Sequence, residues 1–219
     1  MSESTSFDLN AFIKESKETL LNPKVYFSTM RTSGGMAEPV IKALIYGVVA
    51  GVIVFLWGII GLGGRIGVFG AGIGIMGLVY TVIAAVIGLF IGAVILLIIS
   101  SICKGNADFE ANLRVSASAM VLLPVSALLG FTTGINSIFG AIIALCVNLY
   151  GLYILYQGLT VALKANPATT KIVMYVLAAL LLILMLTGLG TRNRVKKYMN
   201  DISQVNLKEL IVNRAGMTC

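Results

Sequence analysis

The sequence predicts an all-α, polytopic integral membrane helical bundle, with five transmembrane helices and an N-terminal amphipathic helix at the membrane interface. Two observations carry this prediction. Of the 219 residues, 58% are hydrophobic and only 11% are charged, whereas a typical soluble domain carries about 25% charged residues, and mean hydropathy is +0.97. Apolar runs also recur that approach or exceed the roughly 20 residues a helix needs to cross a bilayer.

The first predicted element is an amphipathic helix over residues 8–21, within an N-terminal segment, 1–39. Asp8 is a suitable N-cap, because its side chain can accept hydrogen bonds from the first free backbone amides. The apolar residues that share one face are Leu9, Phe12, Ile13 and Leu20. Such a helix either lies on the membrane surface or packs against the ends of the spans, and the sequence leaves both open.

The segment between this helix and the first span is predicted to be an interfacial turn. Pro23 ends the helix, because the residue before a proline disfavours helical geometry. Gly34 and Gly35 permit a turn, and Pro39 suits the first turn of the next helix. The side chains expected at the membrane interface, where aromatic residues are enriched, are Val25, Tyr26, Phe27 and Met30.

The five spans make up a membrane domain over residues 40–190. They are predicted at 40–62, 76–103, 115–131, 136–164 and 172–190. The third is the shortest and contains Pro124, which kinks helices because proline lacks an amide hydrogen and its ring clashes with a carbonyl one turn earlier. A basic, amphipathic tail, 191–219, follows the last span.

The distribution of basic residues predicts the orientation, because Lys and Arg are enriched on the cytoplasmic side. The N-terminal region and the second and fourth loops are basic, whereas the first loop holds only Arg65 and the third holds no charge. The N-terminus is therefore expected inside. The basic cluster after span five favours an even number of spans, since five spans place it outside.

Catalytic and metal-binding patterns are not found in this sequence. Histidine is absent, which removes the usual general base near neutral pH, and the three cysteines show no metal-ligand spacing. Asp108 is interpreted as an N-cap, with Glu110 and Arg114 as an i,i+4 pair. No enzyme activity, cofactor, metal or nucleic-acid partner is therefore expected.

Glycine pairs indicate how the helices pack. Gly47 and Gly51 are spaced four apart, as are Gly88 and Gly92. Small residues at this spacing allow membrane helices to approach closely. These four residues are predicted helix-packing positions.

Three stretches resemble the Yip1-domain membrane proteins, in the compact form found in prokaryotes. These are "NPKVYFSTM" followed by "SGGMAEPVIKAL", then "GNADFEANLRVSASAMVLLP", and then "LYGLYILYQGLTVALKAN". The resemblance covers roughly residues 22–190. The residues that match the family pattern, and are candidate interface residues on that basis, are Pro23, Phe27, Gly34, Gly35, Pro39, Asp108, Phe109, Arg114, Pro124 and Lys164.

The resemblance implies five spans with the N-terminus in the cytosol, and a non-enzymatic role as a membrane scaffold or partner-binding subunit. It implies a bacterial or archaeal cytoplasmic membrane or, alternatively, an endoplasmic reticulum or Golgi membrane. The expected partners are the lipid bilayer and other membrane proteins or further copies of the chain; binding to Rab-type GTPases is implied only for a eukaryotic member. The alternative is a subunit of a transporter or channel, with a polar path near Pro124 and Asn148. The polar residues that suggest this path also include Ser116, Ser118, Ser126 and Gln157.

Overall fold

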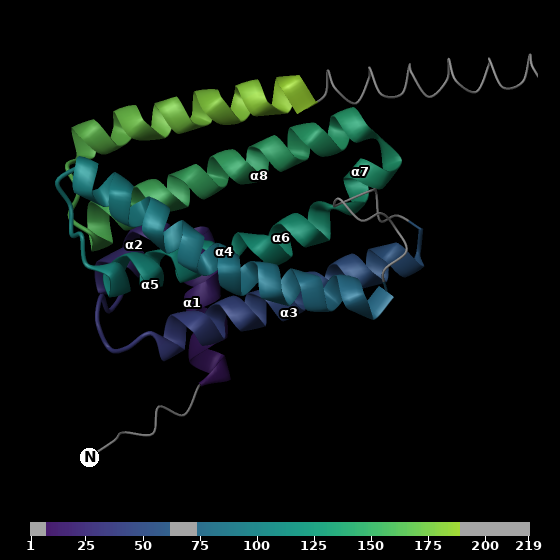
Figure 1. Ribbon diagram of the computed structural model, residues 1–219, viewed down its shortest axis with the longest axis horizontal. Helices are drawn as coiled ribbons and strands as arrows, with labels where there is room; N and C mark the ends of the chain where they lie inside the picture. Colours follow the sequence, from purple (N-terminus) through teal and green to yellow (C-terminus); the bar gives the residue numbers. More distant parts are fainter. Residues whose placement is uncertain (1–7, 62–73, 189–219) are drawn as a thin grey trace, which may run out of the picture. The chain divides into compact units, whose positions relative to one another are not determined.

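A computed structural model describes residues 8–61 and 74–188, and every regular element in these ranges is helical. Five of the helices are long and apolar enough to cross a membrane. The predicted all-α membrane bundle is therefore confirmed (Figure 1). By its internal contacts the chain divides into two units, Met1–Ala178 and Ala179–Cys219, and the account below concerns the first unit unless stated. The predicted basic tail lies outside the described residues.

Two short helices precede the spans. Helix α1 (Leu9–Leu21) begins where the side chain of Asp8 accepts hydrogen bonds from the amides of Asn10 and Ala11. Pro23 follows its end and is also the first residue of α2 (Pro23–Thr29), where its missing N–H costs nothing and its fixed φ suits the helix. We call α1 and α2 together the N-terminal platform.

The spans agree with the predicted order, but several ends differ. They are α3 (Ala37–Ile59), α4 (Gly74–Ile102), the broken helix Phe109–Ile135, α8 (Ser137–Gln157) with its continuation Gly158–Ala162, and Pro167–Gly188. The third, at 27 residues, is longer than the first at 23 and the fifth at 22, so the prediction that it is the shortest was wrong. It starts six residues earlier than predicted because its charged first turns are neutralised by partners described below.

The third span consists of three helices, α5 (Phe109–Ala119), α6 (Leu122–Leu129) and α7 (Phe131–Ile135). The first break falls at Met120 and Val121, one turn before Pro124. Proline cannot donate to the carbonyl four residues earlier, that of Met120, and its ring crowds that carbonyl. The predicted kink at this proline is therefore present.

Glycines allow α3 and α5 to approach α4. A Cβ on Gly47 would lie 2.8 Å from the Cβ of Ala85, and one on Gly51 would lie 3.2 Å from Leu78 Cγ. A Cβ on Gly92 would lie 2.6 Å from the Ser116 hydroxyl. At Gly88 a Cβ would meet no described atom within 4 Å, so this glycine does not support a close helix contact there.

The largest group of buried side chains lies where α2 meets the third and fourth spans. Phe27 is 1% exposed and Tyr26 is 5% exposed, so the expectation that these aromatics lie at the membrane interface is wrong. Their neighbour is the π-helical turn Gly158–Ala162: a Cβ on Gly158 would lie 2.5 Å from Val115 Cγ1 and 3.3 Å from the Phe27 ring. The aromatic residues before the first span are thus core residues of the bundle.

Two turns on the same side of the bundle are hydrogen-bonded to each other. The amide of Asn106 donates to the carbonyl of Leu163 at 2.7 Å, and the amide of Asn166 donates to that of Cys103 at 2.8 Å. In each turn a lysine adopts a positive φ, 57° at Lys104 and 56° at Lys164. These reciprocal bonds tie the end of the second span to the end of the fourth.

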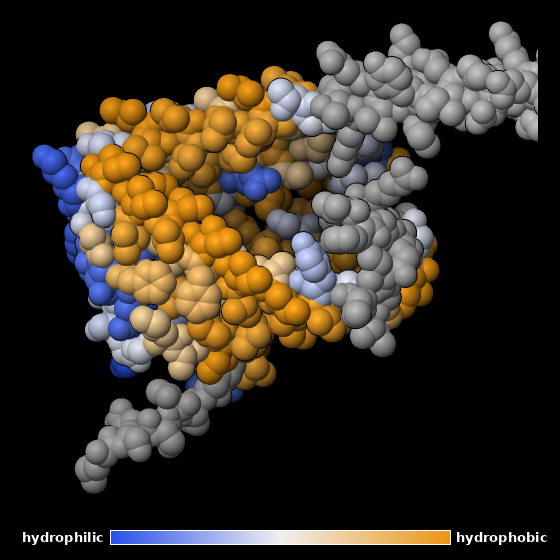
Figure 2. Space-filling model, viewed as in Figure 1, coloured by the Kyte–Doolittle hydropathy of each residue, from blue (hydrophilic) through white to orange (hydrophobic). Residues whose placement is uncertain are grey.

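The sides of the bundle are apolar. Figure 2 shows hydrophobic side chains over much of this view and hydrophilic ones gathered near the turn that joins α4 to α5. On α3 and α4 the isoleucines that are more than half exposed are Ile59, Ile83, Ile87, Ile91, Ile95, Ile98 and Ile102. Exposed apolar helix sides of this kind face lipid, since a soluble protein rarely leaves such patches uncovered.

Candidate functional site

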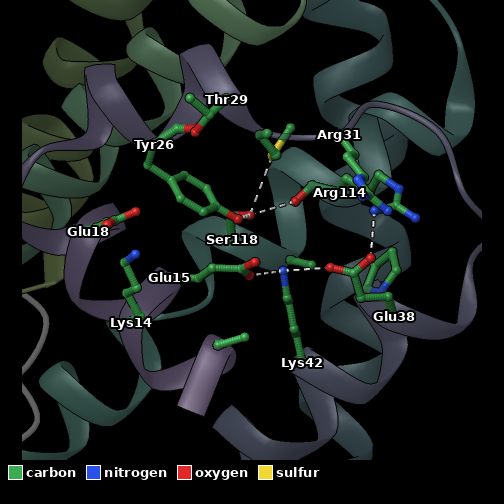
Figure 3. A pocket seen from close by; sticks show the side chains of 14 residues that line it. Lys14, Glu15, Glu18, Tyr26, Thr29, Arg31, Glu38, Lys42, Arg114 and Ser118 are labelled. Carbon is green, nitrogen blue, oxygen red and sulfur yellow. Dashed lines mark hydrogen bonds and ion pairs between the residues drawn. The ribbon is translucent and has the colours of Figure 1, made fainter. Parts of the chain in front are cut away.

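A cavity of about 350 Å³ lies between the N-terminal platform, the start of α3 and the second half of α5. Figure 3 shows the side chains of α1 on one side of it and Arg31 and Arg114 on the other. Its charged and hydroxyl-bearing lining residues are Lys14, Glu15, Glu18, Tyr26, Thr29, Arg31, Glu38, Lys42, Arg114 and Ser118.

Lys42 is one of two buried cations in the cavity wall, with a residue exposure of 8%. Its ammonium lies 2.6 Å from a Glu15 carboxylate oxygen and 2.9 Å from one of Glu38. Burial of an unpaired ammonium is costly, so the two carboxylates are what allow this lysine to lie here. Because Glu15 belongs to α1, this ion pair also attaches the platform to the first span.

Arg114 is the second buried cation, at 6% exposure. Its Nη1 donates to Glu38 at 2.8 Å, its Nε donates to Glu110 at 3.2 Å, and its Nη2 donates to the carbonyl of Gly35 at 2.9 Å. The planar guanidinium suits this role, because its N–H donors point toward several acceptors at once. One side chain thus joins the first span, the third span and the loop between α2 and α3.

The glycine pair is the part of the loop that reaches this arginine. Gly34 has φ of 136° and Gly35 has φ of 97°, a backbone region that only glycine adopts readily. The Gly35 amide donates to Glu110 at 2.7 Å while its carbonyl accepts from Arg114. A Cβ on Gly34 would lie 3.1 Å from Arg114 Nη2, so both conformation and space favour glycine.

Helix α1 is held on α3 by more than the ion pair. The rings of Phe12 and Tyr46 have centroids 5.0 Å apart, and the hydroxyls of Ser16 and Tyr46 are 2.7 Å apart. Thr19 is 2% exposed. Of the two alternatives left open by the sequence, packing against the spans therefore describes the inner face of α1, while Leu9 and Ile13 on its outer side are exposed.

Three charged lining residues have no ion partner among the described residues. Lys14 and Glu18 lie on α1, and Arg31 follows α2. No salt bridge at or below 4.0 Å involves any of them. The cavity therefore offers one carboxylate and two cations that the fold itself does not use.

The predicted site residues separate into two groups. Gly34, Gly35 and Arg114 meet directly, and Pro39 lines the cavity beside them. Asp108 caps α5 by accepting from the amide of Ala111 at 2.9 Å. The predicted residues that lie away from the cavity are Pro23, Phe27, Phe109, Pro124 and Lys164; Phe27 belongs to the aromatic core and Phe109 packs on a second apolar cluster.

Sequence reasoning did not identify the acidic half of this site. Glu15 and Glu38 carry the pairing, and Tyr26 contributes a hydroxyl 2.8 Å from that of Ser118. The available signal was the spacing of Glu38 and Lys42, four residues apart at the start of a span, where both need partners.

The polar path predicted for a transporter is not assembled by these residues. Asn148 is exposed and its amide donates to the carbonyl of Ala144 on its own helix at 2.7 Å. Ser116 donates to the carbonyl of Leu89 at 3.3 Å. The charged cavity is lined by neither Pro124 nor Asn148.

Among the described residues, no group of three His, Cys, Asp or Glu side chains is arranged to hold a metal ion.

In comparison with known families, residues 17–189 match the sequence model of the Yip1 domain. Neither a curated protein nor a solved structure matches the chain.

Proposed function

The chain belongs to the Yip1 family, and from that premise we propose that it is a non-enzymatic membrane organiser, which acts through its N-terminal platform and through helix contacts with other membrane proteins or further copies of itself. It is an integral membrane protein, since five of its helices are long and apolar enough to span a bilayer. Its proposed location is a bacterial or archaeal cytoplasmic membrane with the platform inside.

The single observation that carries this proposal is the two-sided character of the platform. Its inner side is fixed to the first span by Phe12, Ser16 and Glu15, as described above. Its outer side exposes apolar residues and lysines together. These residues are Leu9, Ile13, Leu21 and Val25, with exposed fractions of 56–65%, and the exposed Lys17 and Lys24.

This combination suits the boundary between headgroups and acyl chains. Apolar side chains of an interfacial helix enter the boundary region, and basic residues beside it are attracted by anionic lipid. A platform attached to the spans cannot move along the membrane surface independently of the bundle. The apolar side chains that it inserts into the bilayer therefore displace lipid next to the bundle. That is a physical basis for local shaping of the membrane.

The proposal is tested by reconstituting the full chain into vesicles that contain anionic lipid and measuring vesicle shape by electron microscopy. Wild-type protein is expected to narrow or elongate the vesicles, and Ile13→Glu is expected to abolish the effect because it places a charge on the outer apolar side. Asn10→Glu adds the same charge at an exposed polar position of the same helix and is expected to leave the effect intact. Unchanged vesicle shape with the wild-type chain, together with no cross-linked partner in native membranes, contradicts the proposal.

Orientation is tested separately by labelling Cys219 from either side of the membrane in a Cys146→Ala background, because Cys146 is exposed and Cys103 is buried. Five spans with the platform inside predict labelling from the outside. Labelling only from the cytoplasm contradicts that topology.

A further inference from the structure

We propose that the charged cavity binds the zwitterionic headgroup of a membrane lipid that carries a phosphate and a primary ammonium, as phosphatidylethanolamine does. The proposal rests on the proposed function only for placing this end of the bundle at the membrane surface. It concerns a bound lipid rather than membrane shape, and the two are measured independently.

The charges of the cavity determine the class of ligand. Lys42 and Arg114 are already paired with Glu15, Glu38 and Glu110. The charges that remain are those of Lys14, Arg31 and Glu18, so the unused groups include both signs. A simple anion would leave the carboxylate without a partner, whereas a phosphate joined to an ammonium complements both signs.

The arrangement of these groups fits the two ends of such a headgroup. In Figure 3 Glu18 lies on the α1 side of the cavity and Arg31 lies across it, beside Arg114. A phosphate is expected to be bound at the arginine side, because guanidinium groups recognise phosphate oxygens with paired hydrogen bonds. The ammonium is then directed toward Glu18, and its three N–H donors require a hydrogen-bond acceptor.

The size of the cavity excludes a large ligand. Its volume of about 350 Å³ lies at the lower end of the range of about 300–1,000 Å³ seen for small-molecule sites. A headgroup fits this volume, with its acyl chains outside. The apolar lining residues, Ala11, Met30, Pro39 and Ala117, suit the glycerol end.

The depth of the cavity favours a lipid over a soluble molecule. Lys42 lies five residues beyond Ala37, the first residue of α3, which is about 8 Å at a rise of about 1.5 Å per residue. The headgroup layer on each side of a bilayer is roughly 5–8 Å thick, given about 30 Å of hydrocarbon within a total of about 40–45 Å. With Ala37 placed at the water edge of the headgroup layer, Lys42 is level with the boundary between headgroups and acyl chains.

The experiment adds equal amounts of phosphatidylethanolamine, phosphatidylcholine and phosphatidylglycerol to the delipidated full chain in detergent and counts bound lipids by native mass spectrometry. One phosphatidylethanolamine per chain is expected, retained about tenfold better than the other two, since each competitor lacks one charge-assisted hydrogen bond. The choline ammonium has no N–H donor, and phosphatidylglycerol has no ammonium at all.

Two variants test which residue binds the phosphate end of the headgroup and which binds the ammonium end. Arg31→Gln is expected to reduce retention of phosphatidylethanolamine about tenfold, through loss of a phosphate contact. Glu18→Gln is expected to remove the preference for phosphatidylethanolamine over phosphatidylglycerol, because it removes the charge that repels an anionic lipid. Neither side chain has an ion partner among the described residues whose loss would unfold the chain. Lys17→Gln, on α1 but outside the cavity lining, is the matched control.

Equal retention of the three lipids, or tightest retention of phosphatidylglycerol, would overturn the proposal. An effect of Lys17→Gln as large as that of Arg31→Gln would overturn it too, since it would show general surface attraction. The last measurement is a competition with soluble phosphoethanolamine. If it displaces the lipid at equal concentration, the ligand is a free zwitterion, and the proposal that the cavity binds a lipid is wrong.

Discussion

Two polar side chains of the membrane helices, Arg114 on α5 and Asn148 on α8, differ in what they bind. Both lie within the candidate spans of the structure, yet Arg114 is buried and joins three separate segments, whereas Asn148 is exposed and bonds to its own helix. The difference shows that the ion pairs of the described residues gather at one place, the cavity between the platform and the first and third spans. Elsewhere, packing of small and apolar residues and uncharged hydrogen bonds, such as those between the turns after α4 and α8, hold the helices together.

The largest effect is expected from Arg114→Met. Removal of the guanidinium leaves Glu38, Glu110 and the Gly35 carbonyl without their shared donor, and breaking a buried pair typically costs about 3–5 kcal/mol. The free energy of unfolding in mixed micelles measures the loss. Arg31→Met, an exposed cation without an ion partner among the described residues, is the control and is expected to change it by less than about 0.5 kcal/mol. Equal effects of the two variants would show that the network does not stabilise the fold.

Packing between α3 and α4 is tested by Gly47→Val. Because a Cβ at this position would lie 2.8 Å from the Cβ of Ala85, overpacking is expected to cost about 1–3 kcal/mol. Gly88→Val adds the same side chain where a Cβ meets no described atom within 4 Å. If Gly88→Val destabilises the protein as much as Gly47→Val, helix propensity rather than close packing explains both.

A smaller effect is expected from the ion pair that attaches the platform. A double-mutant cycle with Glu15→Gln and Lys42→Met should give a coupling free energy of about 1 kcal/mol, toward the lower part of the range for contacting residues. The Glu15 side chain is 40% exposed, and solvent screens such pairs. Additive free energies of unfolding would mean that the platform is held by Phe12 and Ser16 alone.

The smallest effect is expected at Asn148. The side-chain amide of Asn148 already has a hydrogen-bond acceptor on its own helix. Hydrogen bonds between membrane helices contribute about 0.6 kcal/mol on average. Asn148→Leu should therefore change the free energy of unfolding by no more than that amount. Solute flux across reconstituted vesicles should be unaffected. A clear change in flux would revive the transporter hypothesis.

Local patterns predicted much of this fold. The five spans depend on the hydropathy of continuous runs of about 20 residues. The cap at Asp108, the Glu110–Arg114 pair and the kink at Pro124 depend on residues within about one helical turn of each other. Each follows from hydropathy, capping or the missing amide of proline. The Yip1-domain match confirmed the resemblance drawn from the longer motifs.

The contacts between distant parts of the sequence that form the cavity could not be predicted from such local patterns. Gly35 meets Glu110 across 75 positions of sequence, and Tyr26 meets Ser118 across 92. A single sequence records that a glycine pair permits a turn, but it does not record where the turn leads. For the same reason Tyr26 and Phe27 were assigned to the membrane interface, although the fold gives them a buried place beside the π-helical turn.

The most direct test of the account is hydrogen–deuterium exchange of α1 in the intact protein in a bilayer. A platform docked on the spans predicts that amides of Leu9–Leu21 are protected well beyond an isolated helix of this length, which is marginal in water. It also predicts that Lys42→Met lowers this protection while the middle of α3 stays protected. Wild-type α1 amides that exchange as fast as those of an unfolded peptide, beside protected spans, would contradict the account.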